Sequence, residues 1–266
     1  MCLMAMAWQL HPKLPLVLAA NRDEFHDRES APMAWWEGQG ILAGRDLRAG
    51  GTWLGLSQTG RIALLTNVRE PGKQDPQLPS RGALVPMWLQ GAPAAAEMAQ
   101  RLRAMPANGY NLLGIDLMAA QAHCWSNRHG HRHALAPGLY GLSNAALDTP
   151  WPKLIRLKRM LDEACRQPDR LSETLMQALS DRQLPSDELL PQTGLSTEWE
   201  RWLSSIFIET PHRRYGTRCS TVIVVEQQTP QEWRVHTVEQ GWDAQGQASG
   251  RVEQSWTVTP SSAPGA

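Results

Sequence analysis

The sequence predicts an α+β fold in which helices cover antiparallel sheets. Three observations support this class: strand-like segments open and close the chain with helical segments between them, the first apolar runs are too short for stable helices, and no internal repeat is present. The length of 266 residues, with 42% hydrophobic and 20% charged residues, suits one globular domain over residues 1–259. Residues 260–266 are small and polar, so we expect a loose C-terminal tail.

Two hairpins are expected in the first quarter of the chain. Apolar runs at 2–8 and 14–20 flank a turn at 9–13, and their continuous apolar character is typical of strands that are covered on both faces. A second pair of strands at 52–57 and 61–66 is joined by a short turn that contains glycine.

The rest of the chain is predicted to contain helices, further strands and one surface loop. Prolines, glycines and charges at 69–80 mark a surface loop, and the leucines at positions 154, 157 and 161 recur at helical spacing. The remaining expected elements are helices at 81–90, 93–104 and 170–182, a helix that opens at 150–152, strands at 110–116 and 120–125, a short strand ending at 140–144, and closing strands at 219–226, 232–239 and 254–259.

Composition excludes several classes of protein. Lys plus Arg is 26 and Asp plus Glu is 26, so the formal net charge is zero and nucleic acid is not an expected partner. The N-terminus has no signal-peptide pattern, and no apolar run is long enough to span a membrane. The four cysteines lie far apart, which predicts neither a zinc site nor a disulfide framework and favours a reducing, cytoplasmic location.

Cys2 directly follows the initiator methionine. If Met1 is removed, a cysteine with a free α-amine remains, and that residue carries both a thiol nucleophile and a base whose pKa is about 8. The alternative is that Cys2 is simply a small apolar residue at the start of a buried strand.

The register of the first hairpin brings polar residues to Cys2. A turn centred near residue 11 places Cys2 opposite the stretch from Ala20 to Arg22, at the start of the tetrad 21–24 (Asn-Arg-Asp-Glu). Because strand side chains alternate, Asn21 shares a face with Asp23, and Arg22 shares a face with Glu24. A nearby arginine would favour the thiolate and a carboxylate would orient the amine; the alternative is a solvated strand end whose charges pair with each other.

Several motifs together resemble a known family. The segments MC, LAANRDEF, GGTWLG, ALLTNVRE, PSRG, YGLSN, TPWPK and YGTR occur here in the order and spacing of the NRDE family, also called the transport and Golgi organisation protein 2 family. The resemblance extends from Met1 to about Thr259. It implies an N-terminal-nucleophile (Ntn) hydrolase-like fold, a four-layer αββα sandwich with two antiparallel sheets, and it links the chain to intracellular haem trafficking and to lipid or acyl-coenzyme A metabolism.

The resemblance also implies roles for particular residues. Ntn enzymes similar to choloylglycine hydrolases and penicillin V acylases use a mature cysteine, an Arg and Asp on the next strand, asparagines for the oxyanion and a late arginine. The corresponding catalytic residues here are Cys2, Arg22, Asp23, Asn67, Asn144 and Arg218. In those hydrolases two residues separate the Arg from the Asp, whereas Arg22 and Asp23 are adjacent, so either Asp23 or Glu24 can be the acid beside Cys2.

Four further residues are candidates for substrate binding: Asn21, Glu24, Trp53 and Arg81. Asparagines at strand ends are also common turn residues, Arg218 and Arg81 can be solvated cations, and Trp53 can be a core residue. Histidines 129, 131 and 133 could bind a metal or haem iron, although exposed turn histidines usually bind neither, and no metal site is predicted.

Two functions follow from the same pocket. One is a cysteine amidohydrolase or acyl transferase that acts on a linear amide or thioester and needs no cofactor. The other is a non-catalytic carrier of haem or acyl-coenzyme A, in which Arg22, Arg81 and Arg218 pair with propionates or phosphates.

Overall fold

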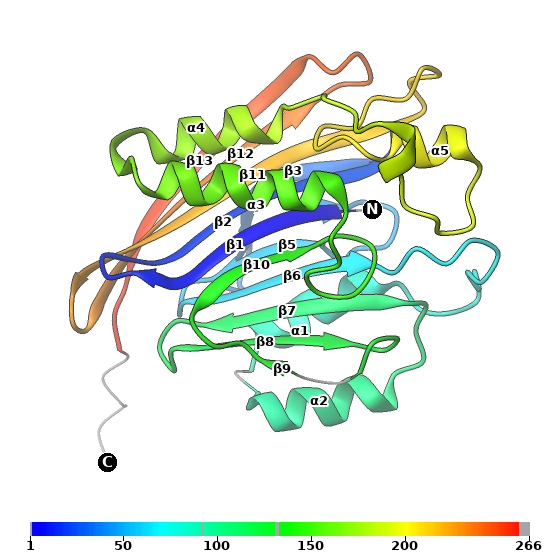
Figure 1. The fold of residues 1–266 in the computed structure, drawn as a ribbon. Coiled ribbons are helices and arrows are strands. Elements are labelled where there is room, and N and C mark those ends of the chain that lie inside the picture. Colours follow the sequence, from blue (N-terminus) through cyan, green and yellow to red (C-terminus); the bar gives the residue numbers. More distant parts are fainter. Residues whose placement is uncertain (1, 92, 131–132, 261–266) are drawn as a thin grey trace.

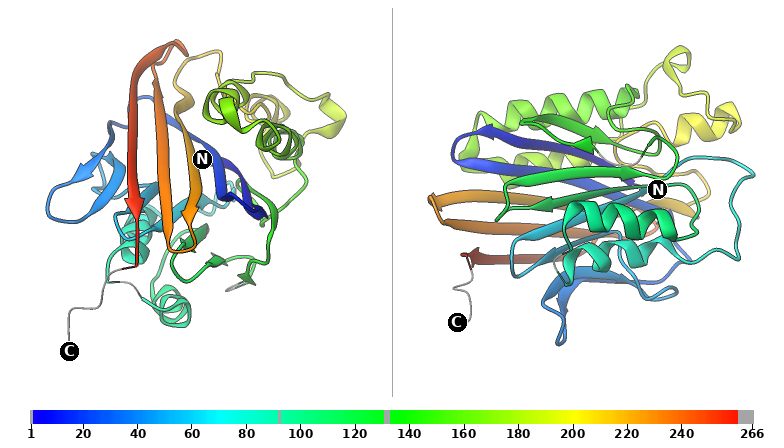
Figure 2. Two further views of the ribbon diagram at one scale, coloured as in Figure 1. Left: turned by 90° about the vertical axis from the view of Figure 1, so that its left-hand side faces the viewer. Right: turned by 90° about the horizontal axis from the view of Figure 1, so that it is seen from below.

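Two antiparallel β-sheets stack face to face between helical layers in the computed structural model, which describes residues 2–91, 93–130 and 133–260 (Figure 1). One sheet has six strands in the order β10-β1-β2-β11-β12-β13, and the other has seven in the order β3-β4-β5-β6-β7-β8-β9. Helices α3 and α4 cover the six-stranded sheet, and α1 and α2 cover the outer face of the seven-stranded sheet (Figures 1 and 2). The predicted α+β class and the αββα sandwich are confirmed.

The elements have the following bounds. The six-stranded sheet consists of β1 (Cys2–His11), β2 (Leu14–Phe25), β10 (Gly138–Leu142), β11 (Tyr215–Thr229), β12 (Glu232–Trp242) and β13 (Ala248–Val258). The seven-stranded sheet consists of β3 (Ser30–Trp36), β4 (Ile41–Asp46), β5 (Leu54–Ser57), β6 (Arg61–Asn67), β7 (Tyr110–Asp116), β8 (Gln121–Ser126) and β9 (His133–Ala134). The α-helices are α1 (Leu84–Leu89), α2 (Ala95–Ala104), α3 (Pro152–Cys165), α4 (Leu171–Leu179) and α5 (Thr197–Trp202), and short 3-10 turns lie at Arg81–Ala83, Pro168–Arg170 and Asp187–Leu189.

Side chains alternate between two cores along β1. Met4 and Met6 point into the core between the sheets, together with Cys2, whereas Leu3 and Ala5 point toward the helices. Both faces are therefore buried, which explains the unbroken apolar run that the sequence shows at 2–8.

Helix α3 lies close against β1 and β10. Pro152 opens the helix, where its missing N–H costs no hydrogen bond, and Leu157 and Leu161 are fully buried on the face toward the sheet. Gly141 of β10 permits this contact, because a Cβ there would lie 2.8 Å from the Leu154 side chain. Helix α3 is thereby held close to β1 and β10.

The sequence prediction missed several elements and shortened others. Strands β3, β4 and β9 and helix α5 were not predicted; β3 contains a proline, β9 has only two residues and α5 only six. Strand β2 does not end at Ala20 but continues through the tetrad to Phe25, and β13 begins at Ala248 instead of residue 254. Of the expected tail, residues 261–266 lie outside the described part of the chain.

Candidate functional site

Three adjacent strands bring two cysteines to either side of one arginine. Cys2 of β1 pairs with Arg22 of β2, and Arg22 pairs on its other side with Cys219 of β11. The pairing of Cys2 with Arg22 confirms the register expected from the hairpin. The register of β11 shifts between Thr217 and Cys219, so Arg218 has no partner on β2 and occupies a β-bulge.

The tetrad divides between the two faces of the sheet, as its alternation predicts. Arg22 and Glu24 lie on the face of Cys2, toward the other sheet. Asn21 lies on the helix side, where its Nδ2 donates to the carbonyl oxygens of Leu179 and Ile206 at 2.8 and 3.0 Å. The Asn21 Oδ1 accepts a hydrogen bond from Ser220 at 2.6 Å. Asn21 is fully buried and does not line the cavity, so the substrate contact expected for it does not fit this geometry.

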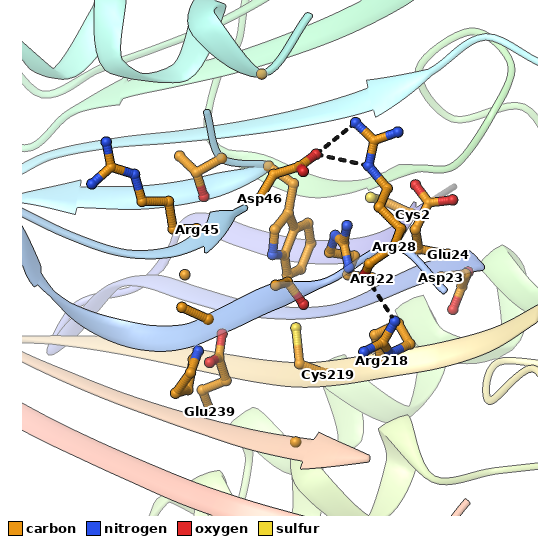
Figure 3. A pocket seen from close by; sticks show the side chains of 18 of the residues that line it. Cys2, Arg22, Asp23, Glu24, Arg28, Arg45, Asp46, Arg218, Cys219 and Glu239 are labelled. Carbon is orange, nitrogen blue, oxygen red and sulfur yellow. Dashed lines mark hydrogen bonds and ion pairs between the residues drawn. The ribbon is translucent and has the colours of Figure 1, made fainter. Parts of the chain in front are cut away.

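A cavity of about 390 Å³ opens between the sheets at Cys2 (Figure 3). Its lining includes Cys2, Arg22, Asp23 and Glu24 near the start of β1, and also Cys219 of β11 and Glu239 of β12. Of the other predicted site residues, the cavity wall includes Asn67, Trp53, Arg81 and Arg218, whereas Asn144 lies behind the wall.

The cavity is rich in arginine. Its lining includes six: Arg22, Arg28, Arg45, Arg81, Arg218 and Arg251. Arg28 is neutralised by Asp46 at 2.7 Å. Arg22 is only 8% exposed, and no hydrogen bond or ion pair of its guanidinium is found within the described part of the chain. A buried guanidinium that lines a cavity without a partner is a binding group for an anion.

The Cys2 thiol is largely withdrawn from solvent. The residue is 6% exposed, and burial raises the pKa of its thiol to about 11. The Ser143 hydroxyl lies 3.3 Å from the Cys2 carbonyl oxygen and donates to it, which fixes the end of β1 against the chain that follows β10. While Met1 is in place, the thiol is therefore protonated at neutral pH and needs a base before it can attack.

The two candidate oxyanion asparagines are joined to each other. The Nδ2 of Asn144 donates to the backbone carbonyl of Asn67 at 2.9 Å, so one of its two N–H groups is used inside the protein. Asn67 ends β6 and lines the cavity, and no hydrogen bond of its side-chain amide occurs among the described residues. Asn67 is thus placed to donate to a ligand, and Asn144 is placed to hold Asn67.

The two acids of the tetrad occupy different surroundings. Burial opposes ionisation of Glu24, but the Phe25 backbone N–H and the guanidinium groups of Arg22 and Arg28 lower the pKa of its carboxyl below the ordinary value. Burial raises the pKa of Asp23, whose Oδ1 accepts a hydrogen bond from Thr217 at 2.8 Å. Glu24 shares the face of Cys2, whereas Asp23 is on the other face of β2, fully buried, near the end of the strand.

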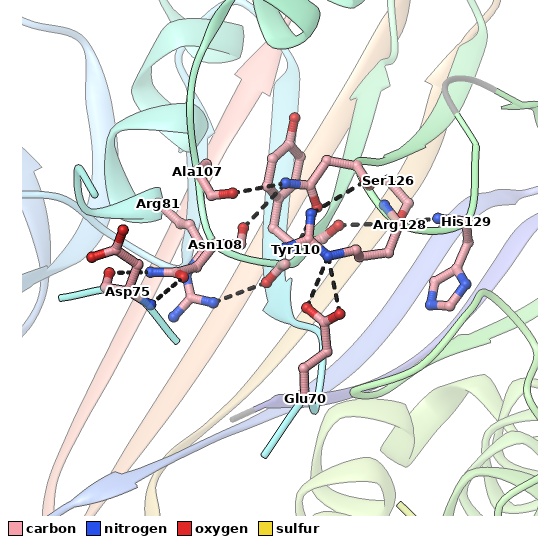
Figure 4. A network of polar contacts seen from close by, with 11 residues as sticks. Glu70, Asp75, Arg81, Ala107, Asn108, Tyr110, Ser126, Arg128 and His129 are labelled. Atoms are coloured by element: carbon pink, nitrogen blue, oxygen red, sulfur yellow. Dashed lines mark hydrogen bonds and ion pairs between the residues drawn. The ribbon is translucent and has the colours of Figure 1, made fainter. Parts of the chain in front are cut away.

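Two of the predicted arginines are held by backbone carbonyls. Nη1 of Arg218 donates to the backbone carbonyls of Phe25, His26 and Arg28 at 3.0 to 3.3 Å. These bonds hold the segment that follows β2 against β11. Nη1 of Arg81 donates to Gly109 at 2.8 Å, inside a polar network around Asn108 and Arg128 (Figure 4). Trp53 is 9% exposed and belongs both to the cavity wall and to the core between the sheets.

Sequence reasoning missed three residues at the site: Cys219, Glu239 and Ser143. Glu239 bridges the sheets, since its Oε1 accepts the backbone N–H of Met33 at 2.7 Å, and its carboxyl group lies near the Cys219 thiol. Burial raises the pKa of both groups. The strand order β1-β2-β11-β12 brings Cys219 and Glu239 close to Cys2, and no local sequence motif predicts that order. Ser143, the third missed residue, lies inside the YGLSN motif.

No metal centre is found among the described residues, where no group of three or more His, Cys, Asp or Glu is close enough to hold an ion. Of the histidine cluster, residue 131 and the side chain of residue 133 lie outside the described part of the chain. No described helix is both long and apolar enough to cross a membrane.

Comparison with known proteins gives a consistent family. The family model for "Transport and Golgi organisation 2" matches residues 1–244. The mouse and human homologues with that description are each 34% identical over 227 and 229 residues, which is 79% of this chain and 82% of theirs. The Drosophila protein is 26% identical over 87% of this chain and 89% of its own.

A solved structure shares the fold. The Caenorhabditis elegans N-acylethanolamine-hydrolyzing acid amidase ortholog matches with a TM-score of 0.50 at 12% identity, over 84% of this chain and 92% of the amidase chain. At that identity the likeness concerns the arrangement of sheets and helices.

Proposed function

The chain belongs to the transport and Golgi organisation 2 family, and from that premise we propose that it is a cysteine hydrolase or acyl transferase of the Ntn type acting on a linear amide or thioester. The observation that carries this proposal is the position of Cys2: it is the first residue of β1, opposite Arg22, and it lines a polar cavity. The shared fold with an acid amidase agrees with an acyl substrate.

The reaction needs Met1 to be removed. Met1 lies outside the described residues, so its removal stays a prediction. The α-amine of Cys2 then accepts the thiol proton, and Sγ bonds to the acyl carbon. The carbonyl oxygen becomes an oxyanion, to which the Asn67 amide donates.

The second half of the reaction restores the thiol. The bond to the leaving amine or thiol breaks, and the leaving group takes the proton that the α-amine holds. Water, or another acceptor, then attacks the acyl carbon and gives up a proton to the α-amine. The carbon–sulfur bond breaks, the acid or the acylated acceptor leaves, and the α-amine returns the proton to the Cys2 sulfur. Arg22 binds an anionic part of the substrate beside the sulfur.

Turnover of a model substrate tests the proposal. The protein, with its N-terminus verified by intact mass, is incubated with the hexanoyl thioester of N-acetylcysteamine, and free thiol is measured. Turnover is expected in the wild type and is expected to be lost in Cys2→Ala. The control is Cys165→Ala, because Cys165 is an equally buried thiol that packs between helices and the six-stranded sheet. Equal turnover in Cys2→Ala and in the wild type would refute the proposal.

A carrier function is the second candidate, and the arginines of the cavity favour it. Haem or an acyl-coenzyme A could place a propionate or phosphate on Arg22, whose buried guanidinium forms no ion pair within 4.0 Å among the described residues. Titration with haem is expected to shift the Soret band with the wild type and to give a weaker shift with Arg22→Met. A Soret band that keeps its free-haem position with the wild type excludes haem carriage. The two functions also differ over Met1, because hydrolysis requires its removal and carriage tolerates it.

A further inference from the structure

The segment that follows β10 connects the two sheets beside the site. Residues 143–145, here called the strap, are hydrogen-bonded to both sheets. On the six-stranded sheet, the Ser143 hydroxyl donates to the Cys2 carbonyl at 3.3 Å. On the seven-stranded sheet, the Asn144 amide donates to the carbonyl of Asn67, the last residue of β6, at 2.9 Å. The strap therefore joins the strand of the proposed nucleophile to the strand of the proposed oxyanion donor.

Asn111, the second residue of β7, anchors the strap. Its Nδ2 donates to the Ala145 carbonyl at 2.8 Å and to the Thr66 hydroxyl at 3.1 Å, so both N–H groups of the amide are used. Thr66 pairs with Asn111 in the register of β6 and β7 and directly precedes Asn67. One amide thus holds the strap and the end of β6 in fixed positions relative to each other.

The polarity of Asn111 is not explained by stability. The residue is 1% exposed, and its Oδ1 is buried without a hydrogen-bond partner in the described part of the chain. A buried acceptor that stays unpaired destabilises the folded state, and an apolar side chain of the same shape would avoid this loss. An amide kept at such a position indicates a role for the bonds that its other end makes.

The rest of the contact between the sheets near the site gives less directional control. Met4 of β1, Leu64 of β6 and Leu113 of β7 meet in one apolar core. Apolar contacts hold surfaces together without fixing their direction, whereas hydrogen bonds weaken steeply when they are bent. A nucleophile and an oxyanion donor on different sheets need the directional constraint, because a misplacement of about 1 Å can cost about a hundredfold in rate.

We propose that Asn111 is a positioning residue: by anchoring the strap to β7, its amide fixes Cys2 and Asn67 relative to each other across the two sheets. The effect on rate rests on the proposed hydrolase. The anchoring itself belongs to the fold and can be measured without turnover.

Amide hydrogen exchange, followed by NMR, measures the anchoring. The probe is the backbone N–H of Arg69, which donates to the Asn144 carbonyl of the strap at 2.7 Å. Asn111→Ala is expected to accelerate its exchange by about tenfold or more, because the strap loses its bond to β7.

Asn127→Ala is the matched control for this experiment. The Asn127 amide also donates to two backbone carbonyls, but these lie in the loop before β7 and not in the strap. Its loss is expected to leave the exchange of the Arg69 N–H unchanged. Exchange at the wild-type rate in Asn111→Ala, or equal acceleration in the two variants, overturns the inference.

Kinetics test the positioning role. Asn111→Ala is expected to lower kcat of thioester turnover by about tenfold or more and to change KM by less than about twofold, because the substrate still binds while the reacting groups are misplaced. In an Asn67→Ala background, the same substitution is expected to lower kcat by less than about twofold, because the donor that it positions is already gone. Equal losses of kcat in the two backgrounds, or reduced stability with an unchanged kcat, overturn the positioning role.

Ser143→Ala is the second variant if Asn111→Ala does not fold. It removes the bond of the strap to Cys2 and leaves Asn111 in place, so it is expected to lower kcat with KM nearly unchanged, and a wild-type kcat overturns the positioning role. Absence of turnover in the wild type, together with faster Arg69 exchange in Asn111→Ala, refutes the hydrolase and leaves the anchoring of the strap supported.

Discussion

Replacing Asn21 with alanine tests whether the first residue of the tetrad is structural. Its side chain makes three buried hydrogen bonds, to the carbonyls of Leu179 and Ile206 and from the Ser220 hydroxyl. Alanine leaves both carbonyls buried without this donor, and each such loss costs about 1–3 kcal/mol. Asn21→Ala is therefore expected to lower the free energy of unfolding by about 4 kcal/mol.

Urea unfolding measures this change, and Asn108→Ala provides a matched control. Asn108 also makes two side-chain hydrogen bonds to a loop backbone, both to Asp75 at 2.8 Å, but these are exposed to water. Because water replaces the lost partners there, the control is expected to cost less than about 1 kcal/mol. Equal losses in the two variants would refute the assignment of Asn21 to the buried helix side of β2.

Three further predictions concern the chemistry of the site. In the chain that keeps Met1, the raised Cys2 pKa of about 11 leaves little thiolate at pH 8, so iodoacetamide should label Cys2 about a hundredfold more slowly than free cysteine. Removal of Met1 should accelerate labelling, and fast labelling with Met1 in place contradicts the burial argument. Asn67→Ala is expected to lower kcat of thioester turnover by about 10²–10³, because an oxyanion donor is lost, and an unchanged kcat excludes that role. Lys153, in the first turn of α3, is buried, and burial lowers the pKa of its ammonium group from 10.5 to about 8. It therefore binds fewer protons in the folded than in the unfolded chain between these pH values, so the free energy of unfolding should rise with pH in that range, and should rise less in Lys153→Met. Urea unfolding at pH 8 and pH 10 measures this, and an equal rise in the two proteins would contradict it.

Local patterns were sufficient to predict the elements that carry the nucleophile. The apolar runs of β1 and β2 and the turn between them gave the pairing of Cys2 with Arg22, because antiparallel register follows from the position of the turn. The period of two along a strand separated Asn21 and Asp23 from Arg22 and Glu24. Helix α3 was recognisable from Pro152 and its leucine spacing.

Features that depend on long-range packing could not be predicted in this way. Cys219 and Glu239 reach the cavity because β11 inserts beside β2, and the strand order of a sheet is not encoded in a local pattern. One N–H of the Asn144 amide donates to the backbone carbonyl of Asn67, a contact between residues 77 positions apart that no local pattern predicts, and the role of Asn144 toward an oxyanion stays a prediction. The depth of Lys153 likewise results from the packing of α3 on the sheet.

The most direct test of a nucleophilic Cys2 is the mass of the protein during turnover. The chain lacking Met1 is mixed with the hexanoyl thioester, quenched in acid and digested. We expect a hexanoyl adduct on the N-terminal peptide at Cys2, which is absent from Cys2→Ala. Turnover without an adduct on Cys2, or an adduct that forms only on Cys219, would contradict the account.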